Sequence, residues 1–100
     1  MFFIKATATR LIDDGGYPEV VLCEFIDVNG YPHKIVEKWP VVSMEDFENI
    51  FPKDCLIGCT VLEEKFESYV VDTEQPWYIE SEEGKTIFEI PKSLLIEMND

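Results

Sequence analysis

The segment EFIDVNGYPHKIVEKWP, residues 24–40, decides the fold, because it holds the strongest hairpin signal in the chain. Asn29-Gly30 lies between two runs of strand-forming residues, and this dipeptide favours the tight turn that joins antiparallel strands. Pro32 stands where the second strand begins, a position at which a missing backbone N–H is tolerated. The pattern predicts a hairpin with strands at residues 19–28 and 31–39.

The two strands nearest the N-terminus differ in their patterning. Residues 19–28, EVVLCEFIDV, are apolar on both faces, which is typical of a central strand covered on both sides. Residues 2–12, FFIKATATRLI, alternate instead and predict a strand with one buried face. That apolar face consists of Phe2, Ile4, Ala6, Ala8 and Ile12. The intervening DDGGYP, residues 13–18, predicts a turn.

One helix is expected after the hairpin, at about residues 44–51. Ser43 can cap it, Asp46 follows three positions later, and Pro52 would end it. Its apolar face would consist of Met44, Phe47, Ile50 and Phe51.

The second half of the chain predicts further short strands, at residues 55–64, 65–73, 76–81 and 85–90. Residues 91–98 fit either a short helix or a closing strand. With 100 residues, one domain is expected. The fold class is therefore mainly β: a small antiparallel β-barrel or sandwich of about six or seven strands with one short helix.

Charge limits the partners of this protein. The formal net charge is −13, and acidic residues occur throughout the chain. Nucleic-acid backbones and anionic membrane surfaces attract Lys and Arg, so we expect no nucleic acid and no membrane partner. A basic protein would be attracted, although acidity that merely maintains solubility is the simpler interpretation.

The sequence also predicts a cytoplasmic location. The opening MFFIKATATR has neither the basic start nor the long apolar stretch of a signal peptide. Three cysteines, an odd number, suggest reduced thiols.

The chain's one histidine, His33, is the first candidate for chemistry. With a two-residue turn, Glu24 and Glu37 share its face and lie within reach, so that either could orient His33 as a general base. A three-residue turn would put Asp27, not Glu24, opposite His33. Because no nucleophile or metal completes the group, we prefer an acid–histidine cluster that is only hydrated.

Metal binding is not predicted, and no cofactor is expected. Cys55 and Cys59 would lie on one strand face roughly 13 Å apart at about 3.3 Å per residue, which favours buried apolar cysteines over a zinc site. The calcium-like DVNG at residues 27–30 lacks the distal glutamate of a calcium loop and is explained by the hairpin turn.

Aromatic residues supply the binding candidates Trp39, Trp77, Tyr78 and Tyr31, since Trp and Tyr are enriched at interfaces. Residues 72–84, DTEQPWYIESEEG, place two of them within an acidic surround that would suit a basic partner. Ordinary strand packing of Trp77 is the simpler alternative.

Two segments, residues 23–43 and 71–90, resemble a group of short single-domain bacterial proteins of unassigned function. The matching positions are Glu24, Phe25, Asp27, Gly30, His33, Glu37, Lys38, Pro40, Val41, Asp72, Pro76, Trp77, Glu80, Ser81, Gly84 and Phe88. In addition KATATRLIDDGG, residues 5–16, is similar to the opening strand and turn of the third domain of elongation factor Tu. That likeness implies a small barrel, and neither likeness implies an activity.

Three functions follow as hypotheses. The first is a non-catalytic protein-binding module, for which a neutraliser of a basic toxin, like bacterial immunity proteins, is one form. The second is a small hydrolase or isomerase that uses His33 with Glu24 or Glu37. The third is a small-molecule-binding barrel with Trp39 and Trp77 at its mouth.

Overall fold

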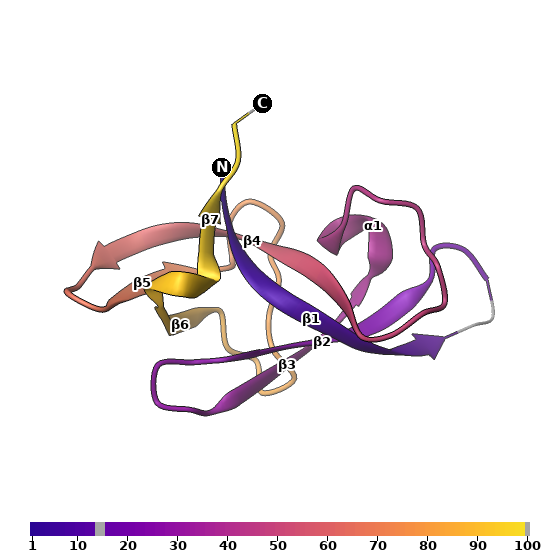
Figure 1. The fold of residues 1–100 in the computed structure, drawn as a ribbon, viewed down its shortest axis with the longest axis horizontal. Helices are drawn as coiled ribbons and strands as arrows, with labels where there is room; N and C mark the ends of the chain where they lie inside the picture. Colours follow the sequence, from indigo (N-terminus) through magenta and orange to yellow (C-terminus); the bar gives the residue numbers. More distant parts are fainter. Residues whose placement is uncertain (14–15, 100) are drawn as a thin grey trace.

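The computed structural model describes residues 1–13 and 16–99, and shows an antiparallel sheet curled into a half-barrel (Figure 1). The seven strands are β1 (Phe2–Asp13), β2 (Val20–Ile26), β3 (Pro32–Lys38), β4 (Lys53–Glu64), β5 (Ser68–Asp72), β6 (Ile87–Pro91) and β7 (Leu95–Glu97). One short helix, α1 (Trp39–Val42), and one 3₁₀ turn, η1 (Lys92–Leu94), complete the elements. The expectation of a mainly β fold with one short helix is confirmed. Part of the turn predicted at residues 13–18 lies outside the described residues.

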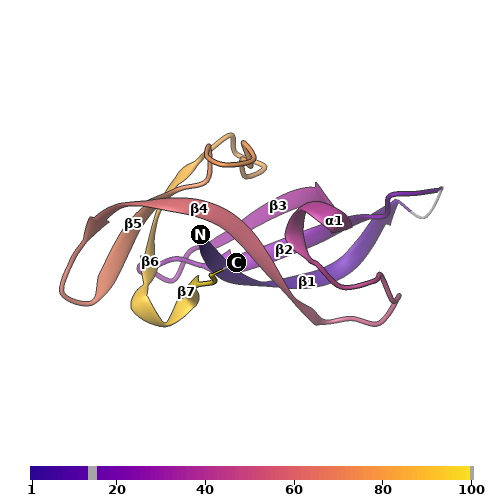
Figure 2. The ribbon, with the colours of Figure 1, turned by 90° about the horizontal axis from the view of Figure 1, so that it is seen from above.

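Strand β1 is the centre of the sheet. The order is β3-β2-β1-β4-β5-β6, with β7 pairing to β1 beside β2. The long strand β4 pairs with β1 through residues 53–59 and with β5 through residues 60–64. It therefore carries the chain from one part of the sheet into the other, and its curved course is visible in Figures 1 and 2.

Contacts between segments that are distant along the chain hold the curled sheet together. The hairpin tip reaches β6, where the Val28 N–H donates to the Glu89 carbonyl oxygen at 2.9 Å. Strand β7 covers the start of β1, and the Met98 N–H donates to the Met1 carbonyl oxygen at 2.9 Å. The chain ends therefore lie side by side (Figure 1).

The core follows the alternation that the sequence predicts. Fully buried residues occur on every part of the half-barrel: Ile4, Val21, Ile35, Ile57, Val71, Ile79 and Ile90. Ala6 and Ala8 are buried on the expected face of β1, whereas Ile12 is exposed. Register irregularities after Ala8 and after Leu11 turn the end of this strand away from the core.

The helix expected at residues 44–51 is not there; the helix is α1, at Trp39–Val42. The side chains of Trp39 and Lys53 bind carbonyl oxygens of this segment instead: the Trp39 Nε1–H donates to the Glu45 oxygen at 2.8 Å and Lys53 Nζ donates to the Glu48 oxygen. Phe47 packs edge-on against the Trp39 ring. Tertiary contacts thus override the local apolar pattern.

Two other elements also differ from expectation. Residues 76–81 form a loop rather than a strand. The undecided segment 91–98 contains the 3₁₀ turn η1 followed by the closing strand β7. No helix in the described part of the chain is long and apolar enough to cross a membrane.

Candidate functional site

Asp27 organises the tip of the β2–β3 hairpin. Its Oδ1 accepts the backbone N–H of Asn29 at 2.9 Å and of Tyr31 at 3.0 Å. Gly30 adopts a φ of +83°, which glycine does without steric cost. The turn is thus a carboxylate-capped loop instead of a two-residue turn.

This turn shifts the hairpin pairing by one residue from the predicted register. Phe25 is the residue opposite His33, and Glu24 is opposite Lys34. Because a one-residue shift moves every side chain to the other face, Glu24 points away from His33. Glu37 shares the face of His33, but its Oε1 accepts the Lys38 N–H at 3.1 Å. The predicted grouping of His33 with Glu24 and Glu37 is therefore wrong.

Asp27 is the acid that contacts His33. The imidazole Nε2 lies 2.8 Å from Asp27 Oδ2 and donates to it, since an ionised carboxylate only accepts. Only 3% of His33 is exposed, and Nδ1 has no hydrogen-bond partner in the described structure. The imidazole lies among the rings of Phe25, Tyr31 and Phe88, with centroid distances of 5.3, 4.9 and 4.7 Å.

Opposing effects act on the Asp27 carboxylate. Its partial burial would raise the pKa, but hydrogen bonds from His33, Tyr31 and Asn29 outweigh this and lower the pKa below its ordinary value. The ionised form is therefore the one that the hairpin stabilises.

The His33–Asp27 pair is built like a structural contact. Within the described residues, no hydroxyl or thiol hydrogen-bonds to His33, and His33 does not line two surface grooves of about 970 and 520 Å³. Asp27 does line the groove of about 520 Å³, and Glu24 lines it as well. Among the described side chains, Asp27 alone hydrogen-bonds to the imidazole, which is almost fully buried.

The cysteines lie in the core. Cys23, Cys55 and Cys59 are all buried and free, and the Cys55 thiol donates to Cys23 Sγ at 3.3 Å. The Cys23 hydrogen bond, followed by burial, raises the pKa of Cys55, and burial raises the pKa of Cys59 to about 12. Within the residues described, no cluster of His, Cys, Asp and Glu is suited to a metal ion. These thiols pack as small apolar groups.

The four aromatic binding candidates lie in different settings. Trp39 is buried at the start of α1, so it is a core residue. Tyr31 is half exposed and its hydroxyl donates to Glu83 Oε1 at 2.8 Å, which raises the pKa of the phenol. Trp77 and Tyr78 are 47% and 61% exposed.

Trp77 and Tyr78 belong to a loop, residues 73–86, that we call the acidic loop. The Trp77 ring lies over Gly58 of β4 and packs against Phe3, with ring centroids 6.0 Å apart. A methyl group on Gly58 would lie 2.6 Å from a Trp77 ring carbon, so glycine is what permits this approach. One ring face is thereby supported while the rest of Trp77 stays accessible.

Hydrogen bonds hold the backbone of the acidic loop. The N–H groups of Tyr78 and Ile79 donate to the carbonyl oxygens of Glu74 and Thr73, at 2.8 and 2.9 Å. The Glu82 N–H donates to the Lys34 oxygen at 2.8 Å and fixes the loop to the edge of β3. Ile79 is fully buried and anchors the loop in the core.

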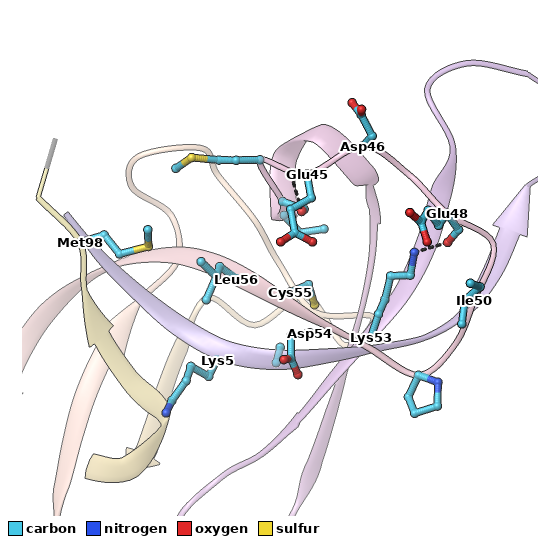
Figure 3. A pocket seen from close by; sticks show the side chains of 15 residues that line it. Lys5, Glu45, Asp46, Glu48, Ile50, Lys53, Asp54, Cys55, Leu56 and Met98 are labelled. Atoms are coloured by element: carbon cyan, nitrogen blue, oxygen red, sulfur yellow. Dashed lines mark hydrogen bonds between the residues drawn. The ribbon is translucent and has the colours of Figure 1, made fainter.

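The sequence did not indicate two further surface features. Phe66, at the tip of the β4–β5 hairpin, is 92% exposed. A groove of about 970 Å³ lies between residues 42–56 and the start of β1 (Figure 3). The pairing of Glu and Lys around Phe66 could have marked a hairpin tip, whereas the groove is lined in part by residues that the sequence predicted as a helix.

No protein-family model, no curated protein and no solved structure matches this chain. The resemblances to unassigned bacterial proteins and to a translation-factor barrel therefore stay predictions.

Proposed function

We propose that this chain is a non-catalytic protein-binding domain that recognises a basic protein through the acidic loop. The observation that carries the proposal is the exposure of Trp77 and Tyr78 on a loop whose backbone is already ordered. Large aromatic side chains supply most of the affinity at protein interfaces, where they form hot spots.

Charge complementarity selects the kind of partner. The acidic loop exposes four glutamates, and Lys85 is its one basic residue. The glutamates are Glu74, Glu80, Glu82 and Glu83. In a chain of net charge −13 the surrounding field has the same sign. Such a surface accelerates association with a basic protein and disfavours acidic partners.

The order of the loop supports binding rather than simple solvation. Tyr78 has a φ of +51°, a backbone conformation that costs a non-glycine residue on the order of 1–3 kcal/mol. The hydrogen bond of its N–H to Glu74 and the buried neighbour Ile79 hold it there. A loop that is ordered before binding loses less entropy when a partner docks.

The two alternative functions receive less support. A hydrolase or isomerase would need His33 in an open site, and His33 is buried behind Tyr31. A ligand-binding barrel would need a hollow interior, whereas the interior of the half-barrel is filled with apolar side chains. Trp39 and Trp77 also pack against different residues, Phe47 and Phe3 respectively. Neutralisation of a basic toxin, in the manner of immunity proteins, is one specific form of the proposed function.

The test is a comparison of captured proteins. Wild type, the double variant Trp77→Ala/Tyr78→Ala and the control Tyr17→Ala are immobilised, and bound proteins are identified by mass spectrometry. Tyr17 is 86% exposed and lies outside the acidic loop, so it matches the loss of an exposed aromatic ring. We expect a basic protein that binds wild type and the control, is lost with the double variant and elutes with rising salt. A partner that binds all three equally would contradict the proposal.

A further inference from the structure

Three aromatic rings surround the ammonium group of Lys53, at the start of β4. The Nζ atom lies 4.9 Å from the ring centroid of Trp39, 4.8 Å from that of Phe47 and 5.4 Å from that of Phe51. All three distances are within the range of cation–π attraction, about 6 Å from a ring centroid. We call this arrangement the Lys53 cage.

The cage replaces a carboxylate as the partner of this charge. Among the ion pairs between described residues, none includes Lys53. Its ammonium group donates a hydrogen bond to the backbone oxygen of Glu48, drawn as a dashed line in Figure 3. Aromatic cages can bind ammonium ligands, and here the chain's own lysine lies over the three rings.

The cage adjoins an acidic surface. Lys53 also lines the groove of about 970 Å³ between residues 42–56 and the start of β1. Figure 3 shows Lys53 extending from β4 toward Glu48, with Glu45 on the neighbouring part of the loop. Four carboxylates line this groove, and Lys5 is its one other basic residue. The carboxylates belong to Glu45, Asp46, Glu48 and Asp54.

Apolar side chains complete the groove. Met44 and Ile50 both line it and are exposed to more than half of their surface. The groove thus combines negative charge with apolar contacts, which suits a lysine-bearing segment of a basic protein. Lys53 lines the groove while its ammonium occupies the cage, so this one side chain connects the two.

We infer that the Lys53 cage is an alkylammonium-binding site held closed by Lys53, and that a lysine side chain of a basic partner displaces Lys53 on docking in the groove. The exchange replaces the ammonium of Lys53 over the rings with the ammonium of the partner's lysine. Whether the partner's lysine is favoured therefore depends on the other contacts that the partner makes in the groove. This inference rests on the proposed function for its partner but concerns a different surface from the acidic loop.

The test uses butylammonium chloride, which reproduces the end of a lysine side chain, with sodium chloride at equal ionic strength as the control. In wild type, the Nζ atom of Lys53 lies over three rings, so the adjoining ε-methylene protons should show upfield NMR shifts. We expect butylammonium, and not sodium, to move these resonances toward the position of a free lysine. Resonances that stay in place, or that respond equally to sodium, would overturn the inference.

A variant isolates the vacated cage. Lys53→Ala removes the occupant, and we expect it to bind butylammonium about tenfold more tightly than wild type, followed through the Trp39 indole N–H resonance. Adding Phe47→Leu should remove the gain, and the neutral analogue butanol should not reproduce it. Equal affinity of Lys53→Ala and wild type would overturn the inference. If Lys53→Ala does not fold, Lys53→Gln, which keeps most of the stem, is judged by the same comparison.

The same titration separates this inference from the proposed function. The Trp77→Ala/Tyr78→Ala variant leaves the cage intact, so its response to butylammonium should equal that of wild type. A normal response together with a failed capture of basic proteins would reject the proposed function alone. A failed response together with loop-dependent capture would reject the cage alone.

Discussion

At the scale of single residues, the contact between Asp27 and His33 ties the β2–β3 hairpin together. The side chain of Asp27 is 14% exposed and that of His33 is 3% exposed, so solvent screens their hydrogen bond only partly. The same carboxylate accepts two backbone N–H groups of the turn. One side chain thus binds two N–H groups of the turn and one nitrogen of the buried imidazole.

Replacing Asp27 should therefore be costly. Asp27→Ala leaves His33 Nε2 buried without its partner and should lower the free energy of unfolding by about 1–3 kcal/mol. Glu24→Ala is the matched control, because Glu24 is nearby but its side chain makes no hydrogen bond among the described residues; it should change stability by about 0.5 kcal/mol or less. Urea denaturation measures both variants. Equal effects would contradict the assigned role of Asp27.

The pH dependence of the same pair has a definite sign. Because the pKa of Asp27 is lowered in the folded chain, its contribution is complete above the unfolded-state value of about 3.9. It is lost as the pH falls through the folded-state pKa. The stability difference between wild type and Asp27→Ala should therefore shrink as the pH is lowered below about 5. A difference that grows on acidification would contradict this.

Gly58 controls the position of Trp77. In Gly58→Ala the new methyl group would meet the Trp77 ring at 2.6 Å, so the ring must leave its place over β4. We expect a loss of about 1–3 kcal/mol in stability and a change in tryptophan emission. Gly16→Ala, where nothing lies within 4 Å of the added carbon, is the control. An unchanged emission spectrum would contradict the packing described for Trp77.

The sequence could predict His33 as a strand residue with acids nearby, but not which acid it contacts. The Asn29-Gly30 signal was interpreted as a two-residue turn. In the folded chain the Asp27 carboxylate caps a longer loop and shifts the register. A side chain that accepts two hydrogen bonds outweighed the local preference of the dipeptide. From the sequence, Asp27 was expected to face His33 only in the alternative of a longer turn.

At the scale of elements, two segments took forms that their local patterns do not show. Residues 44–51 have helical spacing, yet the indole of Trp39 and the ammonium of Lys53 bind two of their carbonyl groups. Residues 76–81 have strand-like composition, yet they form part of the acidic loop, anchored by Ile79. For residues 44–51 these partners lie six and five residues away, and for residues 76–81 the anchor is packing in the core; hydrophobic periodicity reports neither kind of contact.

The anchor of the acidic loop can be tested directly. Ile79→Ala removes a fully buried side chain and should cost about 2–5 kcal/mol. Ile87→Ala is the control, since Ile87 is more than half exposed. Amide hydrogen exchange at Glu82, whose N–H binds Lys34, should accelerate in Ile79→Ala and not in the control. Unchanged protection at Glu82 would show that Ile79 does not anchor the loop.

At the scale of the whole molecule, alternation was enough to predict an antiparallel β domain, but not how the sheet closes. The closing contacts join residues 28 and 89, 34 and 82, and 1 and 98. These are backbone hydrogen bonds between distant segments, and their side chains leave no pattern in the sequence. The net charge of −13, in contrast, follows directly from the sequence and affects the stability of the entire fold.

Self-repulsion should make stability depend on salt. Raising the NaCl concentration from about 0.01 M to about 0.15 M shortens the screening length from about 30 Å to about 8 Å. At pH 7 we expect the melting temperature to rise by about 4 °C, which corresponds to about 1 kcal/mol in a domain of this size. Near the sequence pI of 4.2 the rise should disappear. An equal rise in melting temperature at pH 7 and near the pI would mean that net charge does not cause the salt dependence.

The most direct test of the proposed role is to map the interface with the captured basic protein by amide hydrogen exchange. The account predicts new protection within residues 73–86, centred on Trp77 and Tyr78. It also predicts that Tyr78→Ala raises the dissociation constant about 30-fold, as expected for a hot spot of about 2 kcal/mol. Protection confined to other parts of the chain, together with full affinity of Tyr78→Ala, would contradict the account.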